Sequence, residues 1–538
     1  MIPVRSAPPE LPRTPDNETR PVAEKHSSGI CSIPLFLFCS VLLGAGLVAY
    51  SQTFAFAWDE GFHLLAAKLV SIGRKPYLDF VHAQAPLNAY WNASLMRLFG
   101  EHWRPIHVVD ALMATGAVSL AALFVRSRFQ PVRVAVCMNV ARETVDLADS
   151  RLQGWGAASV IAVFLLAGLN IDVVTFGPIA QAYPFALLLI VGGFYLTVES
   201  VARERTLLAA LAGLLAGLAA ESTLLVAPVA PVLLIWMLLY NPAGKKLARA
   251  AAFVAGVAVA FVPLLALFIQ SPRQVIFGVL QYHIFFRRSD WEGATQHDLE
   301  LLTSWIQSPQ GILLAMLAAA GVWFVRKKSG WDRARQEEFY LAGWIGLVLT
   351  IYLATPHPTF VQYFIFSVPF FAILGSLGLF GIAQQFASAE PAMKHVPLWP
   401  VAVVGVLMCL GLAKELYDNR DDFSWPRMEK VARKVNEVTA PGAPVYLDEM
   451  TYFLSGRIPP PGNEYESSHK LSLPPAFADY VHIIPQAEYD RRIAAGEFDT
   501  IESCDEEDWY QERGLEKLYR HKAEIEECYV FWDRAPKN

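Results

Sequence analysis

Charged residues are scarce in this chain. Asp, Glu, Lys and Arg together make up 17% of its 538 residues, whereas 54% are hydrophobic. Soluble globular domains carry about 25% charged residues, so the composition argues against a water-soluble protein. The net charge is −6 and the basic residues are scattered, which excludes the basic stripe that a nucleic-acid-binding protein needs. The sequence therefore predicts that lipid surrounds most of the chain.

Cysteines are also few, with six in the whole chain, and no pair has the spacing of metal ligands. A disulfide-rich scaffold and a cysteine-based zinc site are therefore excluded. Four cysteines (Cys31, Cys39, Cys137 and Cys409) lie in or beside apolar segments, where we expect them to pack. Cys504 and Cys528 fall in the polar C-terminal region, and whether they form a bridge stays open. No cofactor motif is present, and a requirement for a divalent cation also stays open.

The first 32 residues contain no apolar run and are rich in Pro, Ser, Glu and Arg. This composition predicts a disordered tail rather than a cleaved signal peptide. The first hydrophobic segment would then act as its own signal.

Eleven apolar segments follow the tail. They cover residues 33–54, 106–125, 155–169, 185–198, 207–220, 224–239, 250–268, 312–325, 339–354, 363–382 and 398–413. Several are shorter than the roughly 20 residues that cross a bilayer unaided, so their ends must include neighbouring residues. We expect a membrane domain over residues 33–415.

The placement of Lys and Arg predicts the orientation of these segments. With the N-terminus in the cytoplasm, cytoplasmic connections hold the basic clusters at residues 126–133, 245–249 and 326–335. The outer loops are nearly bare, except for the first loop and the one with Arg273, Arg287 and Arg288. This asymmetry follows the positive-inside rule. Eleven spans then place the C-terminus outside the cytoplasm.

From residue 416 onward the composition becomes that of a soluble domain. Met428, Val431, Val435 and Val438 recur at helical spacing, and residues 444–447 are a strand candidate. We expect a small α/β domain over residues 416–538, on the outer face of the membrane.

The first outer loop, residues 57–105, is too polar to span a membrane. It opens with Asp59 and Glu60, and apolar Phe62, Leu65 and Leu69 follow at helical spacing. The pattern predicts a helix lying along the membrane surface. Two interpretations of Asp59 stay open. It can cap this helix, or it can work with Glu60 to accept a proton from, or orient, an acceptor hydroxyl.

Further short motifs give this loop a resemblance to a known family. The pair Asp59-Glu60 is followed by Gly73, Pro76-Tyr77, Asp79-Phe80, Gln84 and Pro86-Leu87. This order resembles the GT-C glycosyltransferases, and above all their protein O-mannosyltransferase, aminoarabinose transferase and RgtA-like branch. Pro356-His357-Pro358 and Gln362-Tyr363-Phe364 look like the loop that enters a late span of the family, and the segment from Tyr452 to Arg457 looks like part of its outer domain.

The resemblance implies an α-helical multi-pass membrane protein of the GT-C type, with eleven spans and a small C-terminal α/β domain, in a bacterial inner membrane. It implies transfer of a hexosyl or pentosyl group from a polyprenyl-phosphate carrier to an extracytoplasmic lipid, glycan or protein, with inversion. Asp59 would be the catalytic carboxylate, and Glu60 would help to position it or the acceptor.

The sequence departs from the family at two places. Some relatives carry a Glu-Lys pair where this chain has Ala83-Gln84-Ala85, and many carry an Arg where it has Gln181-Ala182-Tyr183-Pro184. Asp172 is the nearest acidic residue to the second place, and it is a candidate for a second carboxylate.

A departing prenyl phosphate needs cations at the membrane boundary. Arg287 and Arg288 follow an aromatic run in an outer loop, so they can bind this phosphate or lipid headgroups. The other candidates for substrate binding can equally be structural. They are Asp79, His82, Gln84, Asp172, His357, Gln362, Tyr363 and Arg457.

A transporter or lipid-linked-sugar flippase is the competing function, because it would also be long and apolar. Such proteins place ionisable residues at mid-membrane depth and show paired repeats. This sequence shows no repeat, and acidic residues gather in its first outer loop instead. A third interpretation is a scaffold that keeps the fold without catalysis.

Overall fold

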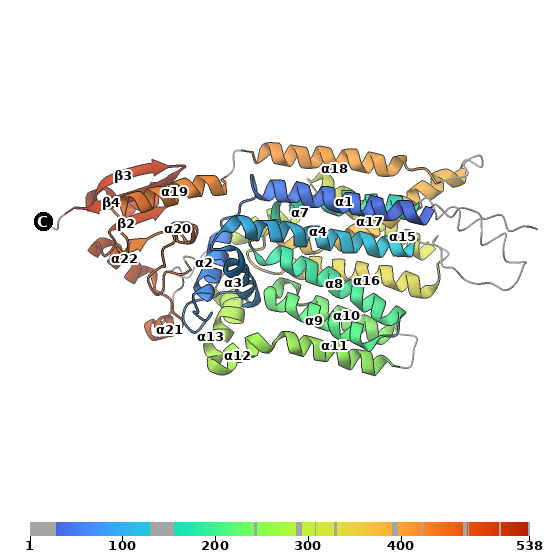
Figure 1. Ribbon diagram of the computed structural model, residues 1–538, viewed down its shortest axis with the longest axis horizontal. Coiled ribbons are helices and arrows are strands. Elements are labelled where there is room, and N and C mark those ends of the chain that lie inside the picture. The colour runs from blue at the N-terminus through green and yellow to red at the C-terminus, as the bar shows by residue number, and fades with distance from the viewer. Residues whose placement is uncertain are drawn as a thin grey trace, which may run out of the picture.

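A computed structural model describes residues 28–129, 155–240, 245–286, 293–306, 308–327, 331–389, 396–420, 423–465, 471, 473–504 and 507–535. A bundle of long helices forms most of the molecule, and a small sheet with its helices lies at one end of it (Figure 1). The expected helical membrane fold with a C-terminal α/β domain is confirmed. The N-terminal tail up to residue 27 and Cys137 lie outside the described residues.

All eleven apolar segments are helical. The helices are α1 (Ser28–Ser51), α4 (Trp103–Arg128), α6 (Trp155–Val163), η1 (Phe164–Gly168), α8 (Ala182–Ala202), α9 (Thr206–Ser222), η2 (Leu224–Val226), α10 (Val229–Leu239), α11 (Lys246–Ala260), α12 (Val262–Gln270), α15 (Pro309–Lys327), α16 (Arg333–Leu353), η4 (Val361–Phe366), α17 (Val368–Ala389) and α18 (Trp399–Asp418). Six of the described helices are long and apolar enough to cross a membrane. The protein is therefore an integral membrane protein, and the count of eleven spans stays a prediction.

The pair α11 and α12 would be a seventh span, bent by 50°. Pro263 lies in the first turn of α12, where its ring and missing N–H break the helix. Glu221 at the end of α9 accepts a hydrogen bond from the freed backbone N–H of Leu264, 2.9 Å away. The bend is thus held by a specific polar contact.

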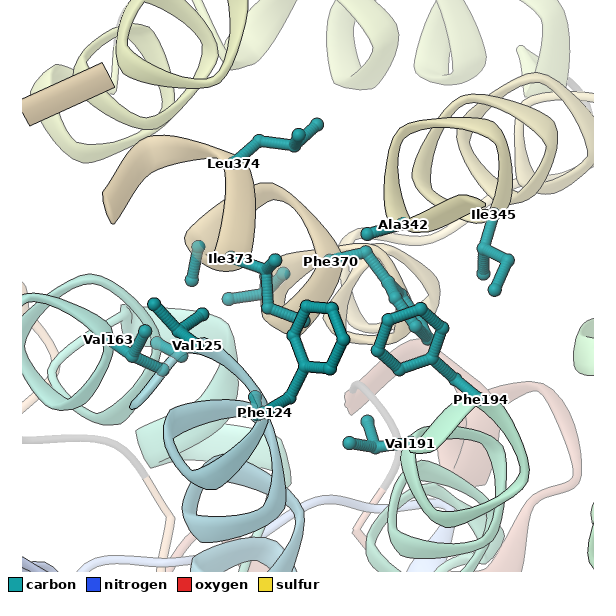
Figure 2. Close-up of a cluster of buried hydrophobic side chains, with 14 of the residues drawn as sticks. Phe124, Val125, Val163, Val191, Phe194, Ala342, Ile345, Phe370, Ile373 and Leu374 are labelled. Atoms are coloured by element: carbon teal, nitrogen blue, oxygen red, sulfur yellow. The ribbon is translucent and has the colours of Figure 1, made fainter. Parts of the chain in front are cut away.

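Aromatic side chains fill the centre of the bundle. The ring of Phe124 on α4 meets Phe194 on α8 edge-on, with 4.8 Å between centroids, and Phe194 meets Phe370 on α17 at 5.6 Å. Figure 2 shows these rings among Val191, Ile345 and other apolar side chains from the same helices and from α16. Close apolar packing of this kind holds membrane helices together in the absence of a hydrophobic driving force.

Shorter helices lie between the long ones along the chain. They are α2 (Glu60–Ser71), α3 (Leu87–Phe99), α7 (Ile171–Phe176), α13 (Pro272–Ile276), η3 (Phe277–Phe286), which is a π-helix, and α14 (Ala294–Ser304). Figure 1 shows α2, α3 and α13 at the end that carries the strands. The first loop and the C-terminal domain therefore lie at the same end of the bundle.

The helix expected after Asp59 forms as α2. Its apolar face, however, is not free to lie along the membrane surface. Residues Leu64, Leu65, Ala67 and Leu69 are fully buried, as is most of the helix. Helix α3 and helix α20 (Glu449–Ser455) of the C-terminal domain both pack against α2. The expectation of an interfacial helix was wrong because protein covers the face that was assigned to lipid.

The C-terminal domain is a four-stranded sheet with helices. Its elements are α19 (Trp425–Val438), β1 (Val445–Tyr446), α20 (Glu449–Ser455), α21 (Pro475–Tyr480), α22 (Gln486–Ala495), β2 (Thr500–Ser503), α23 (Glu507–Glu512), α24 (Leu515–Leu518), β3 (Tyr519–Ile525) and β4 (Cys528–Arg534). The strand order is β1-β2-β4-β3, with β1 parallel to β2 and the other pairs antiparallel. The predicted helix through Met428 and the strand near residue 445 are confirmed, and α18 continues slightly past the boundary expected at residue 415.

Cys504 and Cys528 form a disulfide that joins the end of β2 to the start of β4. The structure thus shows the bridge whose presence the sequence left open. Among the described residues, Cys39 and Cys409 are free thiols.

Replacing Cys504 and Cys528 together by Ala is expected to lower the free energy of unfolding of the outer domain by about 3 kcal/mol, because the bridge restricts the unfolded chain. Thermal unfolding followed by tryptophan fluorescence measures this loss as a lower Tm. Cys409→Ala, at an exposed free thiol on α18, is the control. An equal Tm for the double variant and the control would contradict the prediction.

Candidate active site

A cavity of about 700 Å³ opens at the end of the bundle that carries the C-terminal domain. Its polar lining comes from Asp59, His63, Gln84, Gln181, Tyr183, Thr223, Tyr282, His283, Tyr352, Thr355, His357, Tyr363 and Tyr465. Apolar side chains such as Leu224, Val279 and Phe360 complete the walls. The size and the mixed lining suit a ligand of a few rings.

Asp59 stands at the N-cap position of α2, and its exposed carboxylate lines the cavity. The side chain accepts no capping hydrogen bond from the backbone of α2. The interpretation of Asp59 as a helix cap is therefore not supported. Asp59 is thus a residue of the cavity wall.

Glu60, the next residue, is fully buried and does not line the cavity. Its Oε1 accepts hydrogen bonds from the backbone N–H of Ala180 (2.7 Å) and contacts His107 Nε2 (2.6 Å). Its Oε2 accepts from the backbone N–H of Ala57 (3.0 Å) and the indole N–H of Trp425 (3.2 Å). The two adjacent carboxylates thus face opposite sides of the helix start.

His107 completes the hydrogen bonds of Glu60. His107 Nδ1 lies 3.0 Å from the carbonyl oxygen of Ser51, which only accepts, so Nδ1 carries a hydrogen. Nε2 of the same ring meets Glu60, so both oxygens of this buried carboxyl group have hydrogen-bond partners, as a buried acidic group requires. The rings of Trp103 and Trp425 stack 5.1 Å apart beside this pair.

The outer domain contacts α2 at two further points. A Cβ atom on Gly61 would come within 2.9 Å of the backbone nitrogen of Met450, so only glycine lets α20 approach the helix start this closely. The buried Lys68 donates hydrogen bonds to the carbonyl oxygens of Tyr452 (3.3 Å) and Arg457 (3.1 Å). The guanidinium of Arg457 is engaged elsewhere, with backbone carbonyls at the end of α19 such as that of Thr439 (2.9 Å).

The Gln84 segment is held by η3. His283 donates from Nε2 to the carbonyl oxygen of Ala83 at 2.7 Å, and a Cβ atom on Gly278 would lie 2.3 Å from the carbonyl oxygen of His82. The hydroxyl of Tyr77 donates to the carbonyl oxygen of Gln84. These contacts place Gln84 in the cavity wall.

Residues 354–367, between α16 and α17, form a segment that we call the late loop. It contributes His357 and Tyr363 to the cavity. His357 Nδ1 bonds the carboxylate of Asp298 on α14, and the other oxygen of that carboxylate accepts from the backbone N–H of Thr359 at 2.7 Å. The ring of His357 is therefore fixed by a carboxylate behind it.

Of the residues that the sequence predicts for the site, Asp59, Gln84, His357 and Tyr363 meet in the cavity. The cavity lining does not include Glu60, Asp79, His82, Asp172, Gln362 and Arg457. Asp79 is exposed and closes a turn with the backbone N–H of Lys75 (2.7 Å), whereas Asp172 lies on α7, which packs against α18. Arg287 and Arg288 lie outside the described residues. The roles of all these residues stay predictions.

Several lining residues were not singled out from the sequence. His63 follows Asp59 by four positions, a spacing that puts both on one face of a helix and could have revealed it. Tyr465 and Tyr352 carry no sequence signal, because only the tertiary fold brings them to the cavity.

The side chains that line the cavity carry little positive charge. Burial, with a further contribution from His82, lowers the pKa of His63 to about 3, so this ring is neutral at physiological pH. Burial likewise lowers the pKa of His82 to about 4. No Lys or Arg occurs among the described residues of the lining. Both places where the sequence departs from the family, at Gln84 and Gln181, belong to this lining.

Glu60→Gln is expected to lower the free energy of unfolding by about 3 kcal/mol, because an amide N–H₂ would face donors that now meet a buried carboxylate. The matched control is Glu429→Gln, which weakens a similar contact with an indole, Trp103 Nε1 at 3.0 Å, at a partly exposed site. That change should cost less than about 1 kcal/mol. Thermal unfolding in detergent compares the two variants, and equal losses would show that burial of Glu60 is unimportant.

No protein-family model matches the sequence, and no curated protein is similar enough to count as a relative. Several solved structures match along most of the chain, and two of them are the same protein. They are ArnT from Cupriavidus metallidurans bound to undecaprenyl phosphate and ArnT in the apo state, each with a TM-score of 0.62 and 14% identity over 94% of this chain and 98% of that chain. The oligosaccharyltransferase AglB from Archaeoglobus fulgidus, in complex with an inhibitory peptide and a dolichol-phosphate, matches with a TM-score of 0.49 and 11% identity over 88% of this chain and 69% of that one. The match to ArnT shows that the chain has the GT-C fold, as the motifs of its first loop predicted.

Proposed function

We propose that this protein is an inverting membrane glycosyltransferase. It moves a hexosyl or pentosyl group from a polyprenyl-phosphate carrier to an extracytoplasmic acceptor, which is a lipid, a glycan or a protein. The observation that carries the proposal is the carboxylate of Asp59 in the wall of a cavity where the membrane bundle meets the outer domain. The solved complex of ArnT with undecaprenyl phosphate, which shares the fold, supports a lipid-phosphate donor.

The reaction is a single displacement. Asp59 accepts the proton of the acceptor hydroxyl, or orients that hydroxyl, while its oxygen attacks the anomeric carbon of the sugar. The bond between the anomeric carbon and the phosphate oxygen breaks at the same time, and prenyl phosphate leaves with the electron pair. Attack from the side opposite the leaving group inverts the anomeric centre.

Glu60 acts through its contacts and not on the substrate. Its four hydrogen bonds fix the start of α2 and thereby position Asp59, the residue before it. Gln84 and Tyr363 are placed to hydrogen-bond the sugar from two walls of the cavity.

The leaving phosphate needs positive charge near the membrane boundary. Arg287 and Arg288 are candidates for this role, because they directly follow Phe286, which lines the cavity. The prenyl tail would remain among the membrane helices.

The cavity and the outer domain belong to the extracytoplasmic side in this proposal, with the N-terminus in the cytoplasm of a bacterial cell and the bundle in the inner membrane. Tyr465 and Leu471 of the outer domain line the cavity. This position lets the domain limit which acceptor reaches Asp59.

Asp59→Asn is expected to reduce sugar transfer at least about 100-fold, because the amide cannot accept the proton of the acceptor. Purified protein in lipid nanodiscs is incubated with labelled polyprenyl-phosphate sugars and a membrane extract that supplies acceptors. Glu101→Gln, at an exposed carboxylate in the same loop, is the matched control and should keep full activity. The same assay with and without a chelator tests the need for a divalent cation.

If the wild type turns over a donor and Asp59→Asn turns it over equally fast, the assigned role of Asp59 is contradicted. If the wild type turns over no donor, flux of a lipid-linked sugar across proteoliposomes tests the transporter or flippase instead.

A further inference from the structure

A lipid-phosphate donor brings negative charge into a cavity whose described lining contains no Lys or Arg. Three histidines line it. His63 is neutral because burial lowers its pKa to about 3, and His283 already donates from Nε2 to the carbonyl oxygen of Ala83 at 2.7 Å. His357 is the remaining imidazole, and its surroundings differ from those of the other two.

Helix α14 holds the loop of His357 by three contacts. Asp298 bonds His357 Nδ1 with Oδ2, and its Oδ1 accepts from the backbone N–H of Thr359 at 2.7 Å. His297, the neighbour of Asp298, donates from Nε2 to the carbonyl oxygen of Thr359 at 3.1 Å. Both backbone polar groups of Thr359 are thus bonded to α14, so the loop is anchored independently of the contact between Asp298 and His357.

That contact has two consequences for His357. Because a carboxylate only accepts, Nδ1 carries its hydrogen, and Nε2 is the ring nitrogen left to face a ligand in the cavity. The carboxylate behind the ring also fixes its orientation, as the third group of a catalytic triad does.

We propose that Asp298 is a positioning residue that orients His357 so that its Nε2 meets the phosphate of the prenyl-phosphate substrate. This inference rests on the proposed function, since it assumes a lipid-phosphate ligand. Asp298 touches no substrate itself and acts through the ring of His357. The pair acts from the wall built by α14 and the late loop, whereas Asp59 lines the cavity from the start of α2.

The test compares binding of geranyl phosphate and geraniol to the full-length protein in detergent, by calorimetry. Asp298→Asn keeps an oxygen that can accept from the Thr359 N–H but removes the charge behind His357. We expect it to weaken geranyl phosphate binding about tenfold, as the loss of one charge-assisted hydrogen bond does, and to leave geraniol binding unchanged. His357→Gln should have the same effect.

A double-mutant cycle separates this role from a structural one. The variant with both Asp298→Asn and His357→Gln should bind geranyl phosphate no more weakly than either single variant, because the two residues act as one unit. Glu300→Gln, an exposed carboxylate on the same helix α14, is the matched control for removing one negative charge and should bind as the wild type does.

Each alternative outcome contradicts a different claim. Unchanged phosphate binding in Asp298→Asn, equal losses for geranyl phosphate and geraniol, or additive losses in the double variant would overturn the role of Asp298 and leave the proposed function intact. A wild type that binds geranyl phosphate no better than geraniol would count against the proposed function itself.

Discussion

The hydrogen bonds to the buried carboxylate of Glu60 are the contact on which the geometry of the cavity depends. They join the first loop, the second turn of α4 through His107, the Ala180 loop before α8, and α19 of the outer domain through Trp425. A buried charge is tolerated only when its partners are complete, so a shift of any one of these elements would leave a buried group unpaired. Because Asp59 is the adjacent residue, this network fixes its position while its carboxylate remains in the cavity.

Features that depend on local pattern could be read from the sequence. The apolar segments became helices because hydrophobic runs and their flanking charges are local signals, and the periodicity of Met428, Val431 and Val435 identified α19 for the same reason. The pair Asp59-Glu60 was also found. Its division into one cavity carboxylate and one buried carboxylate could not be predicted, because it depends on Trp425, which lies 365 positions from Glu60 in the chain.

The rest of the cavity shows the same limit. Asp298 carries no motif, and its contact with His357 exists only because α14 folds against the late loop. The π-helix η3 likewise brings Tyr282 and His283 towards the first loop, where Gly278 permits an approach that a side chain would prevent. Such irregular helices often occur at functional sites, but a wider helical turn leaves no periodic signal that distinguishes it from an ordinary helix.

The outer domain contributes to the geometry of the site as well as to its entrance. Its helix α20 lies against Gly61, its Trp425 completes the shell of Glu60, and its backbone carbonyls at Tyr452 and Arg457 bind Lys68. All three contacts reach α2 within its own length, and α2 begins directly after Asp59. A domain that served only to select acceptors could be tethered loosely to the bundle. The buried and hydrogen-bonded junction here instead couples the position of the outer domain to that of Asp59, so the lining of the cavity and the placement of Asp59 are set by the same interface.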